Sequence, residues 1–136
     1  MTSSSNKESH QSLFRVILPV IDIDVAHQFY SQILIQDGTR VSPGRHYFNL
    51  GGTILACYDP KADGDNVNNK WVFHENQYIY IAVNDLEEIH SRIKGFDEKL
   101  ITGDIETMPW GERLFYAKDP FDTPICFVDE STKFMG

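Results

Sequence analysis

Hydrophobic and polar positions along the chain form two blocks with the same order. In the first block, the continuous apolar run Leu13–Val20 is typical of a buried strand. Asp22 follows as a helix cap, and apolar residues such as Phe29 and Ile33 then recur at three- and four-residue intervals until Gly38. The pattern predicts a strand followed by an amphipathic helix that ends near residue 38.

The second block repeats this signal. Tyr78–Val83 has the composition of a strand, and Asp85–Glu88 has the Asp-x-x-Glu pattern of a capping box at a helix start. When Asp22 is laid on Asp85, His27 falls on His90 at the same offset. The chain therefore contains an internal duplication.

After each predicted helix, alternating segments separated by turn residues indicate three short strands. The clearest of these strands and turns are His46–Leu50, Gly51–Gly52 and Thr53–Tyr58 in the first block, and Leu114–Lys118, Asp119–Asp122 and Pro124–Val128 in the second. Each block is thus a βαβββ module, and the expected fold class is α+β.

The length of 136 residues suits one domain with a single core. We expect a disordered polar tail at residues 1–11 and a single domain at residues 12–136. Within this domain, module 1 spans about residues 12–60, a polar linker about 61–76, and module 2 about 77–130.

Composition and charge exclude several function classes. The formal net charge of −8 disfavours nucleic acid and anionic membranes as partners. No apolar run approaches the roughly 20 residues that cross a bilayer, and the first residues lack a signal peptide, so a cytoplasmic location is expected. The two cysteines, Cys57 and Cys126, have no close metal-binding or redox spacing and are expected to be buried and inert.

These motifs resemble the vicinal oxygen chelate superfamily of glyoxalases, extradiol dioxygenases, and fosfomycin- and bleomycin-resistance proteins. The resemblance covers roughly Leu13 to Glu130 and is carried by Val20–Ile23, Phe29–Tyr30, Val83–Leu86, and Pro109–Arg113 leading into Asp119–Pro120. It implies curved mixed or antiparallel sheets around a cup-shaped cleft, with the helices outside. Metal-dependent members hold a divalent ion there through four ligands on the first and last strands of the modules.

The resemblance places these ligand positions on Arg15, Ala56, Tyr78 and Cys126 of this chain. A guanidinium has no lone pair for a metal, and these four side chains together do not supply the imidazole and carboxylate groups that a catalytic divalent ion needs. We therefore expect neither a metal nor another cofactor.

The expected ligand-binding set comprises Arg15, His46, Ala56, Tyr58, Tyr78, Tyr80, Trp110, Arg113 and Cys126. Arg15 either forms a structural salt bridge or binds a carboxylate of a ligand, and both interpretations stay open. The three tyrosines either wall a ligand cleft or pack the cup.

Other polar residues allow alternatives. His46 is expected to face the cleft, where it could form a different metal site with Glu106, Glu112, His74 or Glu75. Arg113 is either a cleft residue or the partner of Asp119. His27 and His90 are expected at the surface of their helices.

The leading hypothesis is a glyoxalase- or bleomycin-resistance-like protein that binds a small organic molecule in an aromatic cleft without a metal. The alternative is a lyase, isomerase or dioxygenase-like enzyme that uses a displaced divalent metal or Arg15 as the electrophile. A homodimer is expected as well, and whether modules are exchanged between its chains stays open.

Overall fold

The computed structural model describes residues 11–66 and 71–135. Of the expected tail, only Gln11 lies within these residues, and residues 67–70 of the expected linker lie outside them. No helix within the described ranges is long and apolar enough to cross a membrane.

Module 1 contains one helix and a four-stranded sheet of order β1-β4-β3-β2. β1 pairs with β4 in parallel, and the remaining neighbours are antiparallel. The elements are β1 (Arg15–Pro19), α1 (Ile23–Leu34), β2 (Thr39–Ser42), β3 (Arg45–Leu50) and β4 (Thr53–Tyr58).

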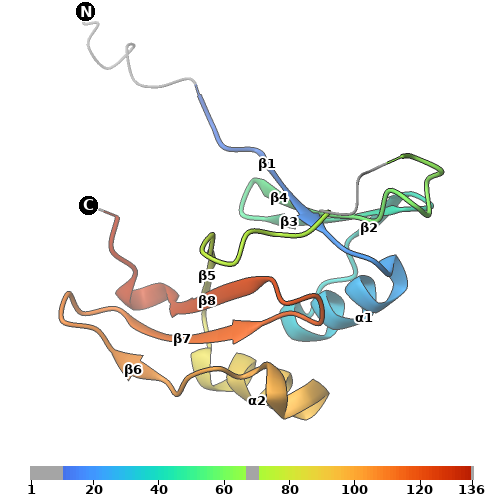
Figure 1. The fold of residues 1–136 in the computed structure, drawn as a ribbon. Helices are drawn as coiled ribbons and strands as arrows, with labels where there is room; N and C mark the ends of the chain where they lie inside the picture. The colour runs from blue at the N-terminus through green and yellow to red at the C-terminus, as the bar shows by residue number, and fades with distance from the viewer. Residues whose placement is uncertain (1–10, 67–70, 136) are drawn as a thin grey trace, which may run out of the picture.

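Module 2 repeats this topology with the order β5-β8-β7-β6, in which β5 is parallel to β8. Its elements are β5 (Ile79–Val83), α2 (Leu86–Asp97), η2 (Glu98–Leu100), β6 (Glu106–Thr107), β7 (Arg113–Lys118), β8 (Pro124–Asp129) and η3 (Glu130–Thr132). The predicted α+β class with two βαβββ modules is confirmed. Each helix covers one face of its own sheet, and the two modules lie side by side (Figure 1).

Both helices begin where the sequence predicts, because an aspartate caps each one. Asp22 accepts hydrogen bonds from the amides of Asp24 and Val25 at 3.1 Å, and Asp85 accepts one from the Glu88 amide at 3.1 Å. The first helix ends earlier than predicted. It stops at Leu34, before Gly38, because its C-cap residue Ile35 takes the left-handed conformation with φ of 50°.

The two modules share one hydrophobic core, which lies between the sheets and their helices. The rings of Phe29 on α1 and Phe96 on α2 meet edge to face, with centroids 5.2 Å apart. The Arg92 guanidinium also donates a hydrogen bond of 3.2 Å to the carbonyl of Ile33 at the end of α1. The modules are therefore joined largely through their helices.

A buried polar contact also joins the modules. The Tyr30 hydroxyl on α1 donates a 2.7 Å hydrogen bond to Asp119 Oδ2, in the turn between β7 and β8. Asp119 is fully buried and also accepts hydrogen bonds from the amides of Phe121 and Thr123. Burial raises the pKa of Asp119, whereas these hydrogen bonds favour its charged form. A buried carboxylate thus stabilises the turn and attaches it to module 1.

His46 lies on the helix-facing side of β3, so the expectation that it faces the cleft is wrong. The residue is only 3% exposed, and its ring stacks on His27 of α1 with centroids 4.1 Å apart. Arg40 Nε donates to His46 Nδ1 at 3.2 Å, which leaves Nε2 as the donor to the Asp37 carbonyl at 2.6 Å. This arrangement requires a neutral imidazole.

His27 and His90 pack against their own sheets and are half-buried, which differs from the expected surface positions. His90 meets Phe115 of β7 edge to face, with centroids 4.9 Å apart, and His27 stacks on His46 at the corresponding place on β3. The internal duplication therefore extends from the sequence to the packing of the helix histidines.

Replacing Tyr30 with Phe is expected to lower the free energy of unfolding by about 1–3 kcal/mol, because the buried Asp119 loses a hydrogen-bond donor. Asp119→Ala should cost more, since the amides of Phe121 and Thr123 lose their acceptor as well. Urea denaturation of both variants measures the two losses. A Tyr30→Phe variant as stable as the unmodified chain would contradict this role.

The stability of the protein is expected to fall in mild acid because of His46. Burial is the main cause that lowers the pKa of His46 below its usual 6.5, with His27 and Arg40 acting in the same direction. Well above pH 6.5 the residue is neutral in both states. As the pH falls from there toward the lower folded pKa, the unfolded chain binds the proton first, and stability is lost.

Urea denaturation between about pH 8 and pH 5 measures this slope. The variant His46→Gln is expected to flatten the slope of stability against pH. The control is His90→Gln, which removes the histidine of α2 that corresponds to His27 and should leave the slope unchanged. An unchanged slope in His46→Gln would show that other groups cause the acid sensitivity.

Candidate functional site

Each sheet has one face turned away from its helix, here called its open face, and strand alternation decides which side chains lie on it. The register places Ile17, Ala56 and Tyr47 next to one another across β1, β4 and β3 of the first sheet. In the second sheet it places Tyr80, Cys126 and Tyr116 next to one another across β5, β8 and β7. These two rows occupy corresponding positions in the two modules.

Arg15 lies at the start of β1 on the open face of the first sheet. Its guanidinium carbon lies 5.2 Å from the ring centroid of Tyr47 and 5.1 Å from that of Phe14, within the range of a cation–π contact. The side chain is exposed to solvent. Among the residues that the structure describes, no carboxylate forms an ion pair with it, so the structural salt bridge considered from the sequence is not found there.

At the opposite end of the same face, Tyr58 belongs to a polar cluster. Arg45 lies over the Tyr58 ring at 4.1 Å and forms ion pairs with Asp63 and Asp65. The Tyr58 hydroxyl donates to Asp65, and this hydrogen bond is the main cause that raises the pKa of Tyr58. Trp71 packs edge to face on the same ring. The polar groups of Tyr58 therefore bind the loop that follows β4.

Tyrosines dominate the open face of the second sheet. The rings of Tyr78 and Tyr116 meet with centroids 5.4 Å apart, and Tyr80 is 59% exposed beside them. The pKa of Tyr80 is raised to about 12, chiefly by burial of its hydroxyl, so this group stays a hydrogen-bond donor at neutral pH. Tyr116 was not among the site residues predicted from the sequence. Successive side chains on a strand point to opposite faces, so the place of Tyr116 next to Phe115 on a predicted strand could have indicated that it lies on the open face.

Cys126 lies under these tyrosines and is fully buried. Burial is the main cause that raises its pKa to about 12, so the thiol stays protonated at neutral pH. Cys57, on the helix-facing side of β4, has its pKa raised to about 12 for the same reason. Both cysteines are thus inert thiols in the folded chain.

The side chains at the expected metal positions do not fit a divalent ion. Arg15 and Ala56 offer no donor atom, so two of the four expected positions cannot hold a metal. Within residues 11–66 and 71–135, no three His, Cys, Asp or Glu side chains gather as a metal site would require. The alternative site considered around His46 is not formed there either, because His46 lies on the opposite face of its sheet.

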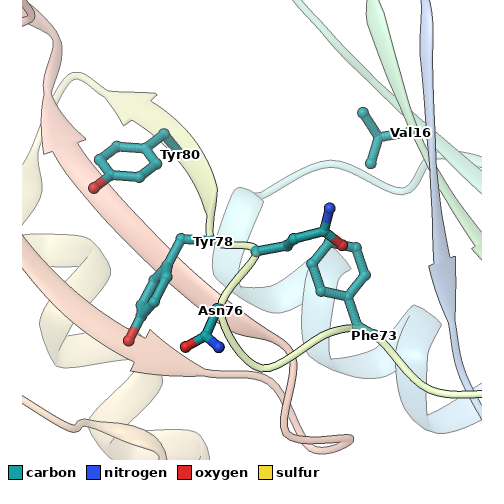
Figure 2. A pocket seen from close by; sticks show the side chains of 6 residues that line it. Val16, Phe73, Asn76, Tyr78 and Tyr80 are labelled. Carbon is teal, nitrogen blue, oxygen red and sulfur yellow. The ribbon is translucent and has the colours of Figure 1, made fainter.

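A pocket of about 680 Å³ lies between β1 and the segment that leads into β5. Figure 2 shows Val16 on β1 across from Phe73 and Asn76, with Tyr78 and Tyr80 extending over the second sheet. A larger groove of about 1000 Å³ continues from it between the outer edges of β1 and β5. Of the predicted site residues, Tyr78 and Tyr80 line both hollows.

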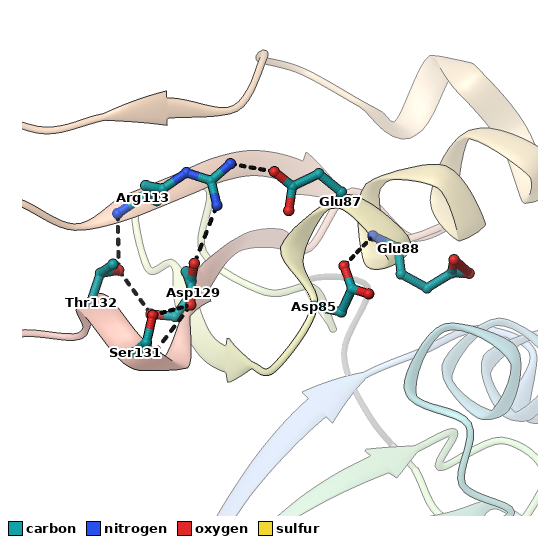
Figure 3. Close-up of polar contacts among 7 residues, drawn as sticks. All are labelled: Asp85, Glu87, Glu88, Arg113, Asp129, Ser131 and Thr132. Atoms are coloured by element: carbon teal, nitrogen blue, oxygen red, sulfur yellow. Dashed lines mark hydrogen bonds and ion pairs between the residues drawn. The ribbon is translucent and has the colours of Figure 1, made fainter.

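Arg113 does not lie on an open face. Its guanidinium forms ion pairs with Glu87 of α2 and with Asp129, the latter at 3.2 Å, and its amide donates to Thr132 (Figure 3). The partner considered from the sequence, Asp119, is instead buried beneath Tyr30. Arg113 therefore links α2, β8 and η3.

Trp110 lies in the turn before β7 and is 57% exposed. Its indole nitrogen donates a 2.8 Å hydrogen bond to Glu112, whose other oxygen accepts the Phe134 amide at 2.7 Å. This contact joins the turn to the last described residues of the chain.

No family model matches the sequence, and no curated protein matches it by sequence. Its fold, however, is similar to those of many solved proteins. A glyoxalase-related enzyme from Fulvimarina pelagi is 14% identical, with a TM-score of 0.68 and 93% of each chain covered. A lactoylglutathione lyase from Agrobacterium tumefaciens is 17% identical, with a TM-score of 0.67 and coverage of 91% of this chain and 98% of that one.

A member of the glyoxalase/bleomycin resistance protein/dioxygenase superfamily from Sphaerobacter thermophilus is 22% identical, with a TM-score of 0.59. The match covers 88% of this chain and 98% of that one. Such likenesses span nearly the whole chain and agree with the two βαβββ modules and their strand orders. The chain therefore has the fold of the glyoxalase/bleomycin resistance protein/dioxygenase superfamily, the vicinal oxygen chelate fold.

Proposed function

We propose that this chain is a cytoplasmic protein that binds a small organic molecule on its open faces without the help of a metal. The observation that carries the proposal is the group of Tyr78, Tyr80 and Tyr116, which presents aromatic rings and hydroxyl groups beside a pocket. Aromatic walls with a few polar groups are typical of sites for small organic ligands.

The chemistry of the open faces favours binding over catalysis. The thiol of Cys126 is protonated and buried, so it is a poor nucleophile. The imidazole of His46, which could act as a base, lies on the other side of the first sheet. The tyrosine rings and the Arg15 guanidinium are suited to holding a ligand by stacking and hydrogen bonds.

We further propose that two chains assemble into a homodimer in which the modules of different chains face each other. β1 and β5 end their sheets, so each has one edge that forms no strand pair within the described residues. The apolar side chains of Leu13 and Phe14, just before β1, and of Ile17 on β1 are exposed. Pairing of these edges with a second chain would cover the apolar residues and bring two open faces together.

The binding proposal is tested with the neutral fluorescent dye N-phenylnaphthylamine. The dye should bind the protein with the same affinity before and after treatment with EDTA, and the melting temperature should stay unchanged. Tyr80→Ala should weaken binding roughly five-fold, because the ring is lost, whereas the control Tyr80→Phe should retain most of the affinity. A loss of binding or stability on chelation would reveal a metal and contradict the proposal.

The dimer proposal is tested by light scattering at micromolar concentration. The unmodified chain should have about twice the monomer mass of 15.6 kDa. Ile17→Lys places a charge on the exposed strand and should yield the monomer, whereas Val72→Lys, at another exposed apolar position, should not. A mass near 15.6 kDa for the unmodified chain across a broad dilution range would exclude the dimer.

A further inference from the structure

We infer that the ligand is an organic anion with a flat ring, and that Arg15 pairs with its carboxylate or sulfonate group. This inference rests on the proposed binding function and adds the chemical class of the ligand. Its basis is the contrast between Arg15 and the other arginines of the chain.

All other arginines are neutralised by carboxylates. Arg40 pairs with Asp24, Arg45 with Asp63 and Asp65, Arg92 with Glu88, and Arg113 with Glu87 and Asp129. Arg15 has no such partner among the described residues, although the chain carries 20 carboxylates and a net charge of −8. One uncompensated guanidinium on an open face of an acidic protein marks a place where an anion is favoured.

The surroundings of Arg15 leave its hydrogen-bond donors accessible. A guanidinium that lies over an aromatic ring keeps its N–H groups in its own plane, and these can bind a carboxylate in a bidentate manner. The contacts with Phe14 and Tyr47 also restrict the long side chain, so less conformational entropy is lost when an anion binds. The side chain is therefore held ready for an anion.

The rest of the open face does not repel an anion near Arg15. The strand positions nearest to it on this face are occupied by Ile17, Asn49, Ile54, Tyr47 and Ala56. The carboxylates of Asp63 and Asp65 interact with Arg45, at the other end of β4. A ring attached to the anionic group would find the aromatic face of Tyr47 beside Arg15.

The second open face offers a hydrogen-bond donor to the ligand. The Tyr80 hydroxyl can donate to an oxygen of the ligand, and the nearby Glu112 carboxylate, which helps to raise the pKa of Tyr80, is itself held by Trp110 and the Phe134 amide. In the proposed dimer this face and the face of Arg15 are two walls of one site.

The test compares two dyes with the same ring system in the full chain. Anilinonaphthalene sulfonate carries the anionic group, and N-phenylnaphthylamine lacks it. Fluorescence titration should give about ten-fold tighter binding of the sulfonate. Arg15→Met, which keeps the bulk of the side-chain stem, should abolish this preference and leave the neutral dye bound as before.

Two further variants control the experiment. Lys94→Met removes one positive charge from the exposed end of α2 and should keep the preference for the sulfonate. Arg15→Lys keeps the charge but loses the bidentate geometry, and should retain part of the preference. Melting temperatures of all variants verify that each is folded.

The outcomes separate the two proposals. If both dyes bind equally well and Arg15→Met changes neither affinity, the anion inference is wrong while the binding function stands. If Lys94→Met reduces the preference as much as Arg15→Met does, net charge is the cause and the inference is wrong too. If neither dye binds the folded protein, the proposed function fails and this inference fails with it.

Discussion

The relative position of the two modules depends on the hydrogen bond between Tyr30 and Asp119. Apolar contacts such as that between Phe29 and Phe96 also join the modules, but they do not fix one orientation as strictly as a buried directional bond. Misplacement of α1 would leave the buried Asp119 carboxylate without its hydroxyl donor, at a cost of about 1–3 kcal/mol. The Tyr30–Asp119 hydrogen bond therefore helps to set how the two open faces are oriented, although neither residue lies on an open face.

Much of the fold could be predicted from the sequence, because its signals are local and occur twice. Asp22 and Asp85 indicate the helix starts because aspartate is a common N-cap residue, and the apolar segments indicate the strands. The faces of single strand residues were harder to predict. A shift of one position in the assumed phase moves a side chain to the opposite face, and His46 was misplaced in this way. Arg113 lies on the helix-facing side of β7, and its partner Glu87 is far away in the sequence.

The candidate site shows how one architecture can support different chemistry. The vicinal oxygen chelate fold brings corresponding strand positions of two modules onto open faces, whichever residues occupy them. In this chain those positions carry a guanidinium, aromatic rings and a buried thiol. The sequence shows which side chains stand at the expected metal positions. It does not show that Arg15 has no carboxylate partner within the described residues, since that depends on the placement of the acidic side chains around it.

The location of Arg15 on a terminal strand of its sheet has a thermodynamic consequence. β1 carries both this guanidinium and the unpaired edge that we propose for subunit contact. Any molecule that orders β1 through Arg15 would then strengthen association of the chains, and association would raise the affinity for that molecule by the same factor. Occupancy of the site and the oligomeric state would thus be reciprocally linked, so that the concentration of the protein itself would set its apparent affinity.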